Sequence, residues 1–320
     1  MTELDVVPGA LGVARFDPGQ PVPAWAHGEF AALLRTPAEL TVVVADDQIP
    51  ANVTAERGFR AMAVRGPVPF STVGLLAALT GALASAEVSV FALSTFDTDW
   101  ILVRSSDLAA SVAALRRAGF PVHGFPARPT LLLDLLDTLV ADPIHREIPA
   151  FLGLPTVEYF KLKDPTAWVD FELGRCDHPA FCARMFADRR RVDPGGLLAA
   201  VEAGWSLLPG IDALLARLGP TDVHVVSNYP IWWRAIAARE PLRRRVDRWF
   251  VSCETGVRKP DPEAYLGVAR ALGRAPGECV FVDDKPRNVS AAQRVGMTGI
   301  VFAGADGLAV ALERVGVTGR

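Results

Sequence analysis

Four apolar runs beyond residue 130 of this 320-residue chain each end in a short polar motif, and this pattern constrains the fold more than any other feature. The runs are typical of buried strands, and they alternate with stretches long enough for helices. Such alternation predicts a doubly wound parallel sheet (α/β), in which the carboxyl ends of the strands meet at one edge. We therefore expect the motifs to converge on one crevice. In chain order they read LLLDLLDTLV, VVSNYP, GVRKPDPEAY and VFVDDKPRNV.

Five residues of these motifs suit phosphoryl transfer assisted by a metal ion. Asp134 ends the first run, and a carboxylate there can attack phosphorus to form an aspartyl-phosphate. Ser227 can donate a hydrogen bond to a phosphoryl oxygen, and Lys259 offers a point positive charge. Asp283 and Asp284 suit a hard cation such as Mg²⁺. Because a carboxylate repels a phosphate dianion, cations are expected between the two.

Three further residues are expected to contact the substrate. Thr138 lies four residues after Asp134, and Asn228 can donate to a phosphoryl oxygen beside Ser227. Tyr229 lies two residues from Ser227, which makes it the aromatic side chain best placed to stack on a planar substrate. The other aromatic side chains beyond residue 141 are expected to form the core of a helical subdomain rather than to stack on a substrate.

The order and the residues of the four motifs resemble those of the haloacid dehalogenase superfamily across residues 130–302. The resemblance implies a Mg²⁺-dependent phosphoric monoester hydrolase. It implies that the nucleophile is Asp134, the phosphate-binding residue is Ser227, the lysine is Lys259 and the metal carboxylates are Asp283 and Asp284.

The first motif departs from the pattern of most phosphatases in that superfamily. They carry DxDxT, in which the second Asp protonates the leaving oxygen, and here Leu136 takes its place. The Leu136 carbonyl is still expected to bind the metal, because that ligand needs no side chain. The missing acid matters, since general acid catalysis contributes about 10²–10⁴-fold. Asp137 either substitutes for it or fixes the turn after the strand.

Two explanations for Leu136 follow from resemblance. True dehalogenases of the superfamily also lack the acid, but they need no metal, and the Asp283–Asp284 pair counts against them. The segments DLLDTLVADPIHREIPAFLGLP, SNYPIWW and RKPDPEAY resemble the plant chloroplast FMN hydrolases, which carry a similarly substituted first motif. That resemblance implies hydrolysis of flavin mononucleotide (FMN) or a related phosphate ester.

Before residue 125 the expected strands no longer alternate regularly with helices, as they do beyond residue 130. This difference predicts a separate α+β domain, similar to ACT domains, over residues 1–124. The Pro/Gly-rich connector PVHGFPARP predicts a linker at 125–129, followed by the hydrolase domain at 130–320. Within the latter, 141–205 has no strand signal and is expected to form a helical cap. The elements expected in the first domain are strands at 40–45, 59–64, 88–94 and 100–103, a helix at 72–86 capped by Ser71, and a helix at 108–118 capped by Ser106 or Asp107.

The segment from Glu56 to Phe120 resembles ACT domains of the arginine-sensor type, chiefly through the phrase FALSTFDTDWILV. The resemblance implies a bound amino-acid effector contacted by Thr95, Phe96 and Asp99. Such domains usually bind ligands between two modules, and this chain supplies one full copy, so a homodimer is expected. A domain that only holds subunits together is the alternative, and the two interpretations remain open.

Composition excludes several classes of function. The formal net charge of −3 argues against nucleic acid or an anionic membrane as a partner, because both need a basic face. The four cysteines lack CxxC spacing, so free thiols are favoured over a zinc site built on Cys176, His178 and Cys182. The N-terminus resembles neither a signal nor a transit peptide, which predicts a cytoplasmic protein.

We therefore expect a Mg²⁺-dependent phosphatase acting on a small-molecule phosphate ester. One alternative is a non-catalytic amino-acid sensor whose hydrolase domain is silenced by Leu136. Another is an amino-acid-pathway phosphatase of phosphoserine type, because those enzymes also pair ACT domains with this fold. Their first motif keeps the second Asp, which ranks that alternative lower.

Overall fold

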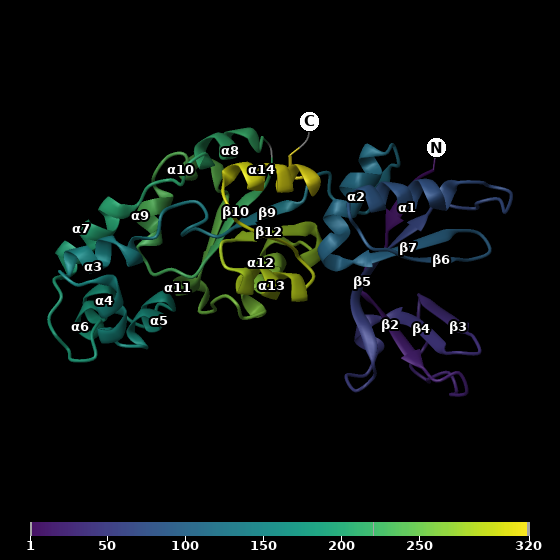
Figure 1. Ribbon diagram of the computed structural model, residues 1–320, viewed down its shortest axis with the longest axis horizontal. Helices are drawn as coiled ribbons and strands as arrows, with labels where there is room; N and C mark the ends of the chain where they lie inside the picture. Colours follow the sequence, from purple (N-terminus) through teal and green to yellow (C-terminus); the bar gives the residue numbers. More distant parts are fainter. Residues whose placement is uncertain (1, 220, 319–320) are drawn as a thin grey trace. The chain divides into compact units, whose positions relative to one another are not determined.

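The computed structural model describes residues 2–219 and 221–318. The chain divides between Ala127 and Arg128 into two main compact units, each with its own sheet (Figure 1). The predicted fold class is confirmed, because a largely antiparallel α+β unit precedes a unit built on parallel strands. Among the described residues, no helix combines the length and the apolar content that crossing a membrane requires.

The first unit is an eight-stranded sheet with two helices. Its elements are β1 (Leu4–Val6), β2 (Leu11–Phe16), β3 (Ala31–Arg35), β4 (Leu40–Ala45), η1 (Asp46–Gln48), β5 (Ala55–Val64), α1 (Leu75–Ser85), β6 (Phe91–Ser94), β7 (Asp99–Arg104), η2 (Ser105–Asp107), α2 (Leu108–Arg117) and β8 (Val122–His123). The long strand β5 pairs with β2 and then β1 along one edge, and with β7 along the other. Helices α1 and α2 pack against each other beside β7 (Figure 1).

Strand β4 is buried on both faces of this sheet. Its bounds are those predicted for residues 40–45. Successive strand side chains point to opposite faces. Leu40, Val42 and Val44 accordingly pack into one cluster, and Val43 packs into a second cluster with Leu11.

Two expectations for the first unit need correction, and three strands were missed. The helix predicted at 72–86 begins at Leu75, because Gly74 has a φ of 86°, which cannot continue a right-handed helix, and Ser71 is not its cap. Helix α2 continues from η2 with no side-chain hydrogen bond from its N-cap Asp107. Strands β1 to β3 were not predicted; β3, for example, is mostly exposed and lacks an alternating apolar pattern.

The second unit has a five-stranded sheet with strand order β11-β10-β9-β12-β13. Its strands are β9 (Thr130–Leu133), β10 (Val223–Ser227), β11 (Arg248–Val251), β12 (Cys279–Asp283) and β13 (Thr298–Val301). The strands β9, β10 and β12 are buried along their whole length, as expected for a parallel sheet covered on both faces. Figure 1 shows α8 and α14 on one side of this sheet and α12 and α13 on the other.

Helices make up the rest of the second unit. They are η3 (Pro143–His145), α3 (Glu147–Phe151), α4 (Thr156–Leu162), α5 (Ala167–Glu172), α6 (His178–Arg184), α7 (Pro194–Gly204), α8 (Ile211–Arg217), α9 (Trp233–Ala237), α10 (Leu242–Arg245), α11 (Ser252–Thr255), α12 (Glu263–Leu272), η4 (Pro276–Glu278), α13 (Pro286–Arg294) and α14 (Ala305–Arg314).

Helices α3 to α7 lie between β9 and β10 in the chain and form a cap (residues 141–205). Aromatic side chains pack inside it: the rings of Phe171 and Phe181 stack with centroids 4.6 Å apart. The two chain segments at its base bind each other, since the Ala141 N–H donates to the Ser206 carbonyl at 2.9 Å. The cap therefore leaves and rejoins the sheet at one place.

Candidate active site

The register of the parallel strands brings the polar motifs to one edge of the second sheet. Leu133 of β9 pairs with Val225 of β10 and with Val282 of β12. The next residue, Asp134, donates its N–H to the Val282 carbonyl at 2.8 Å. The residues that follow these strands must therefore lie side by side.

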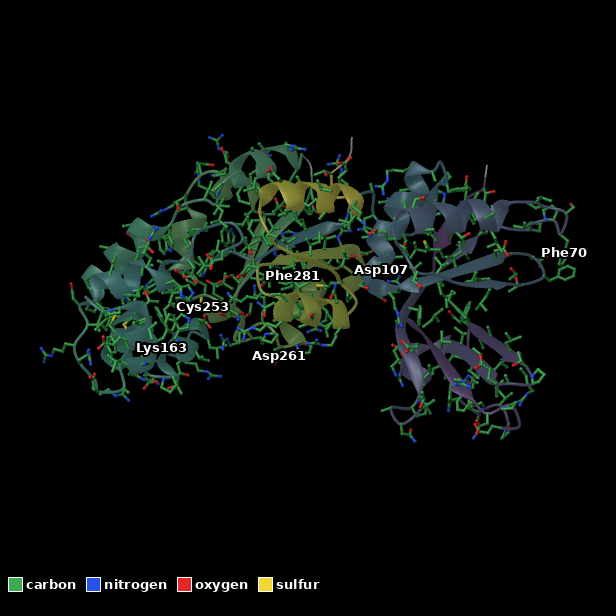
Figure 2. All side chains as sticks on the ribbon, viewed as in Figure 1. Phe70, Asp107, Lys163, Cys253, Asp261 and Phe281 are labelled. Carbon is green, nitrogen blue, oxygen red and sulfur yellow. The ribbon has the colours of Figure 1, made fainter. Side chains whose placement is uncertain are left out.

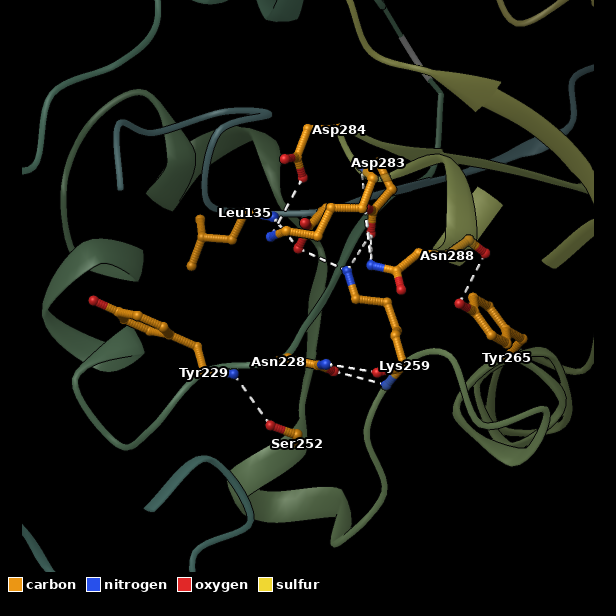
Figure 3. Close-up of polar contacts among 11 residues, drawn as sticks. Leu135, Asn228, Tyr229, Ser252, Lys259, Tyr265, Asp283, Asp284 and Asn288 are labelled. Carbon is orange, nitrogen blue, oxygen red and sulfur yellow. Dashed lines mark hydrogen bonds and ion pairs between the residues drawn. The ribbon is translucent and has the colours of Figure 1, made fainter. Parts of the chain in front are cut away.

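Three carboxylates gather at this edge and form an aspartate cluster: Asp134, Asp283 and Asp284. Each offers an oxygen that lies within 4.8 Å of the others. The buried ammonium of Lys259 lies 2.7 Å from Asp134 Oδ1 and 2.6 Å from Asp283 Oδ2 (Figure 3). With all three carboxylates ionised, Lys259 offsets one charge and Lys285 lies 3.7 Å from Asp284, so one negative charge still has no partner in a largely buried site, which is costly unless a cation joins them.

The hydrogen bonds of the cluster indicate which oxygens are available to a cation. Both oxygens of Asp283 accept from Asn288 Nδ2 at 3.0 Å, and its Oδ1 also accepts from the Lys285 N–H at 2.9 Å. Asp284 Oδ1 is buried without a hydrogen-bond partner among the described residues, and the Lys285 ammonium lies 3.7 Å away. Carboxylate oxygens are the ligands that Mg²⁺ takes, so these residues fit that ion.

The buried position of Asp134 changes its acidity. Burial raises the pKa of Asp134 to about 7, while the Lys259 ammonium acts in the opposite direction. Asp283 contributes to this rise, because a second carboxylate nearby disfavours the charged form. A cation bound to the cluster would favour the carboxylate of Asp134, which is the form that can attack phosphorus.

A cavity of about 300 Å³ opens over Asp134 and extends under the cap. Ser227, Leu136 and the aromatic rings of Phe160 and Trp168 line it. Its volume is at the lower end of the range for small-molecule pockets, roughly 300–1,000 Å³.

The predicted substrate residues have different surroundings. Asn228 lines the cavity, but its side chain is bonded to the backbone of Lys259. Tyr229 also lines it, with its ring directed away from Lys259 (Figure 3) and its hydroxyl accepting from Trp205 Nε1 at 3.2 Å. Thr138 is fully buried and is not among the lining residues. Their roles toward a substrate stay predictions.

Asp137, the residue weighed as a substitute acid, is bonded within its own turn. It has a φ of 55°, and its Oδ1 accepts from the Asp142 N–H at 3.1 Å. It is not among the residues that line the cavity. These contacts favour the interpretation that Asp137 fixes the turn after β9.

The sequence interpretation missed several charged residues of the cavity. Glu172 of α5 accepts from Trp168 Nε1 at 2.6 Å and pairs with Arg258 at 2.6 Å, which joins the cap to the motif that carries Lys259. Asn288 carried a usable signal, since it lies in the first turn of α13 after a strand-end aspartate. The others in the lining are Asp142, His145, Lys285 and Arg287.

The residues predicted to contact an effector lie in the β6–β7 hairpin of the first unit. Thr95 Oγ1 donates to the Thr98 carbonyl at 2.9 Å, and Asp99 Oδ1 accepts from Ser94 Oγ at 2.5 Å. Phe96 is 79% exposed, and its ring meets that of Phe70 with centroids 5.2 Å apart. Figure 2 shows Phe70 at the tip of its loop. Their role in binding stays a prediction.

Comparison with known proteins identifies the family. The chain is 40% identical over 191 residues to flavin mononucleotide hydrolase 1, chloroplastic, of Arabidopsis thaliana, which covers 59% of this chain and 78% of that protein. The chain belongs to the haloacid dehalogenase-like hydrolases. A model of that family matches residues 178–296, a model of the ACT domain matches 54–117, and a further model described as an N-terminal domain matches 9–52.

Other relatives of this haloacid dehalogenase-like hydrolase are similar over shorter stretches. A sesquiterpene phosphatase of Aspergillus oryzae is 45% identical over 158 residues, covering 46% of this chain and 76% of that protein. A haloacid dehalogenase family enzyme of Bacteroides thetaiotaomicron, solved with magnesium and inorganic phosphate, is 22% identical with a TM-score of 0.47, covering 54% of this chain and 93% of that one.

Proposed function

We propose that this hydrolase is a Mg²⁺-dependent phosphatase that cleaves a small phosphate monoester, with FMN as the leading substrate. One observation carries the proposal: the Asp134 carboxylate lies at a strand end, open to a cavity and 2.7 Å from the Lys259 ammonium. A carboxylate so placed can attack phosphorus, while the ammonium offsets the repulsion between two anions.

The proposed reaction assigns a role to each motif. Asp134 attacks phosphorus and becomes an aspartyl-phosphate, while Ser227 and Lys259 hold the phosphoryl oxygens. Water then releases phosphate and restores the Asp134 carboxylate. Mg²⁺, held by Asp134, Asp283, Asp284 and the Leu136 carbonyl, supplies positive charge to the transferring group.

The choice of FMN rests on similarity and on the lining of the cavity. The relative from Arabidopsis thaliana is named a flavin mononucleotide hydrolase, and the one from Aspergillus oryzae a sesquiterpene phosphatase. The rings of Phe160 and Trp168 line the cavity and can contact a planar or apolar leaving group. We expect FMN to exceed glycerol phosphate as a substrate because only FMN has an aromatic ring system to contact them.

The first experiment is phosphate release from a panel of monoesters headed by FMN, with p-nitrophenyl phosphate and phosphoserine included. Turnover should require Mg²⁺, stop with EDTA and be lost in Asp134→Asn. Preference for phosphoserine would favour the amino-acid-pathway alternative. Release from no ester would sink the proposal and leave the silenced sensor as the better explanation.

The domain assignment and the regulation are proposals too. We place a regulatory domain at 1–124, a linker at 125–129 and the hydrolase at 130–320, in a cytoplasmic protein. The regulatory domain is proposed to bind an amino acid through Thr95, Phe96 and Asp99 in a homodimer. Calorimetry with the twenty amino acids and light scattering test this; no binding would leave at most a structural role, and a monomer would exclude the dimer.

A further inference from the structure

We propose that Asp142 is the proton donor that replaces the acid missing at Leu136. The inference rests on the proposed phosphatase function and concerns the oxygen that leaves phosphorus. That oxygen departs as an alkoxide unless it is protonated, so an alkyl phosphate such as FMN needs an acid. Leu136 cannot supply the proton, and Asp137 is bonded in its turn outside the cavity lining.

The chain folds back after β9 so that Asp142 reaches the same cavity as Asp134. The Asp137 N–H donates to the Val140 carbonyl at 2.7 Å, which closes the turn. Asp137 Oδ1 then accepts from the Asp142 N–H, and the adjacent Ala141 is bonded to Ser206 at the base of the cap. Asp142 is thus held from two sides, eight residues after the nucleophile.

The side chain of Asp142 has one oxygen engaged and one available. Its Oδ1 accepts from the Ile144 N–H at 2.9 Å, as the N-cap of η3. Within residues 2–219 and 221–318, no hydrogen bond or ion pair engages Oδ2. The carboxyl group of Asp142 can therefore carry its proton on Oδ2 while Oδ1 keeps the N-cap hydrogen bond from Ile144.

Glu172 is the other carboxyl group of the lining under the cap, and its contacts exclude it as a donor. Its Oε1 accepts from Trp168 Nε1, and its Oε2 pairs with Arg258. An ion pair and an accepted hydrogen bond both stabilise the ionised form. Burial nevertheless raises the pKa of Glu172, so the geometry decides: both of its oxygens are engaged in holding the cap, whereas Asp142 Oδ2 is available to exchange a proton.

The surroundings of Asp142 let its carboxyl group keep a proton at a higher pH than an ordinary aspartate does. Burial, with a smaller contribution from the charge of Asp137, raises the pKa of Asp142 to about 6 against the hydrogen bond from Ile144. His145 and Lys285 act in the opposite direction. The remaining titratable groups that interact with it are Tyr159, Tyr229 and Glu172.

Protons and bonds balance in both half-reactions, the transfer of the phosphoryl group to Asp134 and its release to water. As Asp134 forms its bond to phosphorus, the bond from phosphorus to the leaving oxygen breaks, and that oxygen takes the proton of Asp142 to become an alcohol. Water then attacks the aspartyl-phosphate and gives a proton to the Asp142 carboxylate. Phosphate leaves, and both aspartates return to their starting states.

The test compares two leaving groups in Asp142→Asn. Asparagine keeps the N-cap hydrogen bond but carries no acidic proton. We expect kcat/KM for FMN to fall by about 10²–10⁴-fold. For p-nitrophenyl phosphate, whose leaving group needs little protonation, it should fall less than about tenfold. An equal loss with both esters, or no loss, would overturn the proposal.

A matched control and a second measurement keep the outcomes distinct. Asp177→Asn makes the same change at the N-cap of α6, outside the cavity lining, and should retain both activities. Wild-type turnover of p-nitrophenyl phosphate that is lost in Asp134→Asn tests the phosphatase function separately. Infrared spectra near pH 6, where Asp134 also carries a proton, should show less protonated-carboxyl absorption in Asp142→Asn than in the wild type and in Asp177→Asn; equal absorption in all three proteins would refute the assignment.

Discussion

Asn228 and Lys259 hold each other through two hydrogen bonds. The Lys259 N–H donates to Asn228 Oδ1 at 2.7 Å, and Asn228 Nδ2 donates to the Lys259 carbonyl at 2.8 Å (Figure 3). Lys259 itself bonds to two buried carboxylates, so the backbone that carries it must be accurately placed. The amide of Asn228 thereby fixes the second motif to the third.

The Asn228→Ala variant should lose this link. Removing one partner leaves backbone groups of Lys259 unpaired, so the free energy of unfolding should fall by about 1–3 kcal/mol. Phosphatase activity should fall with it, because the ammonium is no longer fixed. Urea denaturation measures the first effect. The control is Asn52→Ala at an exposed position, which should stay within about 0.5 kcal/mol of wild type. Equal stability of the two variants would contradict the assigned link.

Lys259→Met should leave the aspartate cluster without its buried ammonium. Breaking a buried ion pair from one side costs about 3–5 kcal/mol, because the remaining charge is uncompensated. Mg²⁺ should restore part of that loss by neutralising the same carboxylates. Thermal unfolding with EDTA and with Mg²⁺ tests both statements, and Lys161→Met at an exposed cap position is the control. The interpretation fails if the melting temperature of Lys259→Met is no higher in Mg²⁺ than in EDTA.

Mg²⁺ should stabilise the wild-type protein through Asp284. A ligand that binds only the folded state at one hundred times its Kd adds about 2.7 kcal/mol. Asp284→Asn removes a buried oxygen that lacks a hydrogen-bond partner, so most of this gain should vanish. Differential scanning calorimetry at increasing Mg²⁺ measures the effect. Asp212→Asn, on an exposed position of α8, should keep the full shift. An unchanged response in Asp284→Asn would exclude Asp284 as a ligand.

The raised pKa of Asp142 predicts a pH-dependent difference in stability. Because the folded state holds this proton more tightly than the unfolded chain, its stabilising contribution is complete below the ordinary aspartate pKa. It is lost as the pH rises through about 6. The melting temperature of Asp142→Asn minus that of the wild type should therefore increase as the pH rises from about 4 to 7.

Metal-free thermal unfolding across that range, in EDTA, measures the difference. Asp177→Asn is the control, because it removes the carboxylate of another helix N-cap in residues 141–205. A difference between Asp142→Asn and the wild type that stays constant with pH, or that changes equally in Asp177→Asn, would rule out a raised pKa at Asp142.

Much of the second unit could be predicted because its signals are local. Strands β9, β10 and β12 are apolar along their whole length, and each ends in or beside a polar residue. A parallel sheet brings such ends together whatever lies between them, so Asp134, Ser227 and Asp283 had to meet. The first unit was harder, because the strands β1 to β3 are short or exposed and carry little periodic signal.

The sequence by itself determined which residue types meet at the sheet edge, since hydrophobic patterning indicates the buried strands and parallel strands end at one edge. Only the tertiary structure decided which of their polar atoms remain free. The engagement of Glu172 by Arg258 and of Asn228 by Lys259 joins segments far apart in the sequence, whose relative position no local pattern encodes. A hydrogen bond depends on distance and direction in space, and these are set only when those segments pack together.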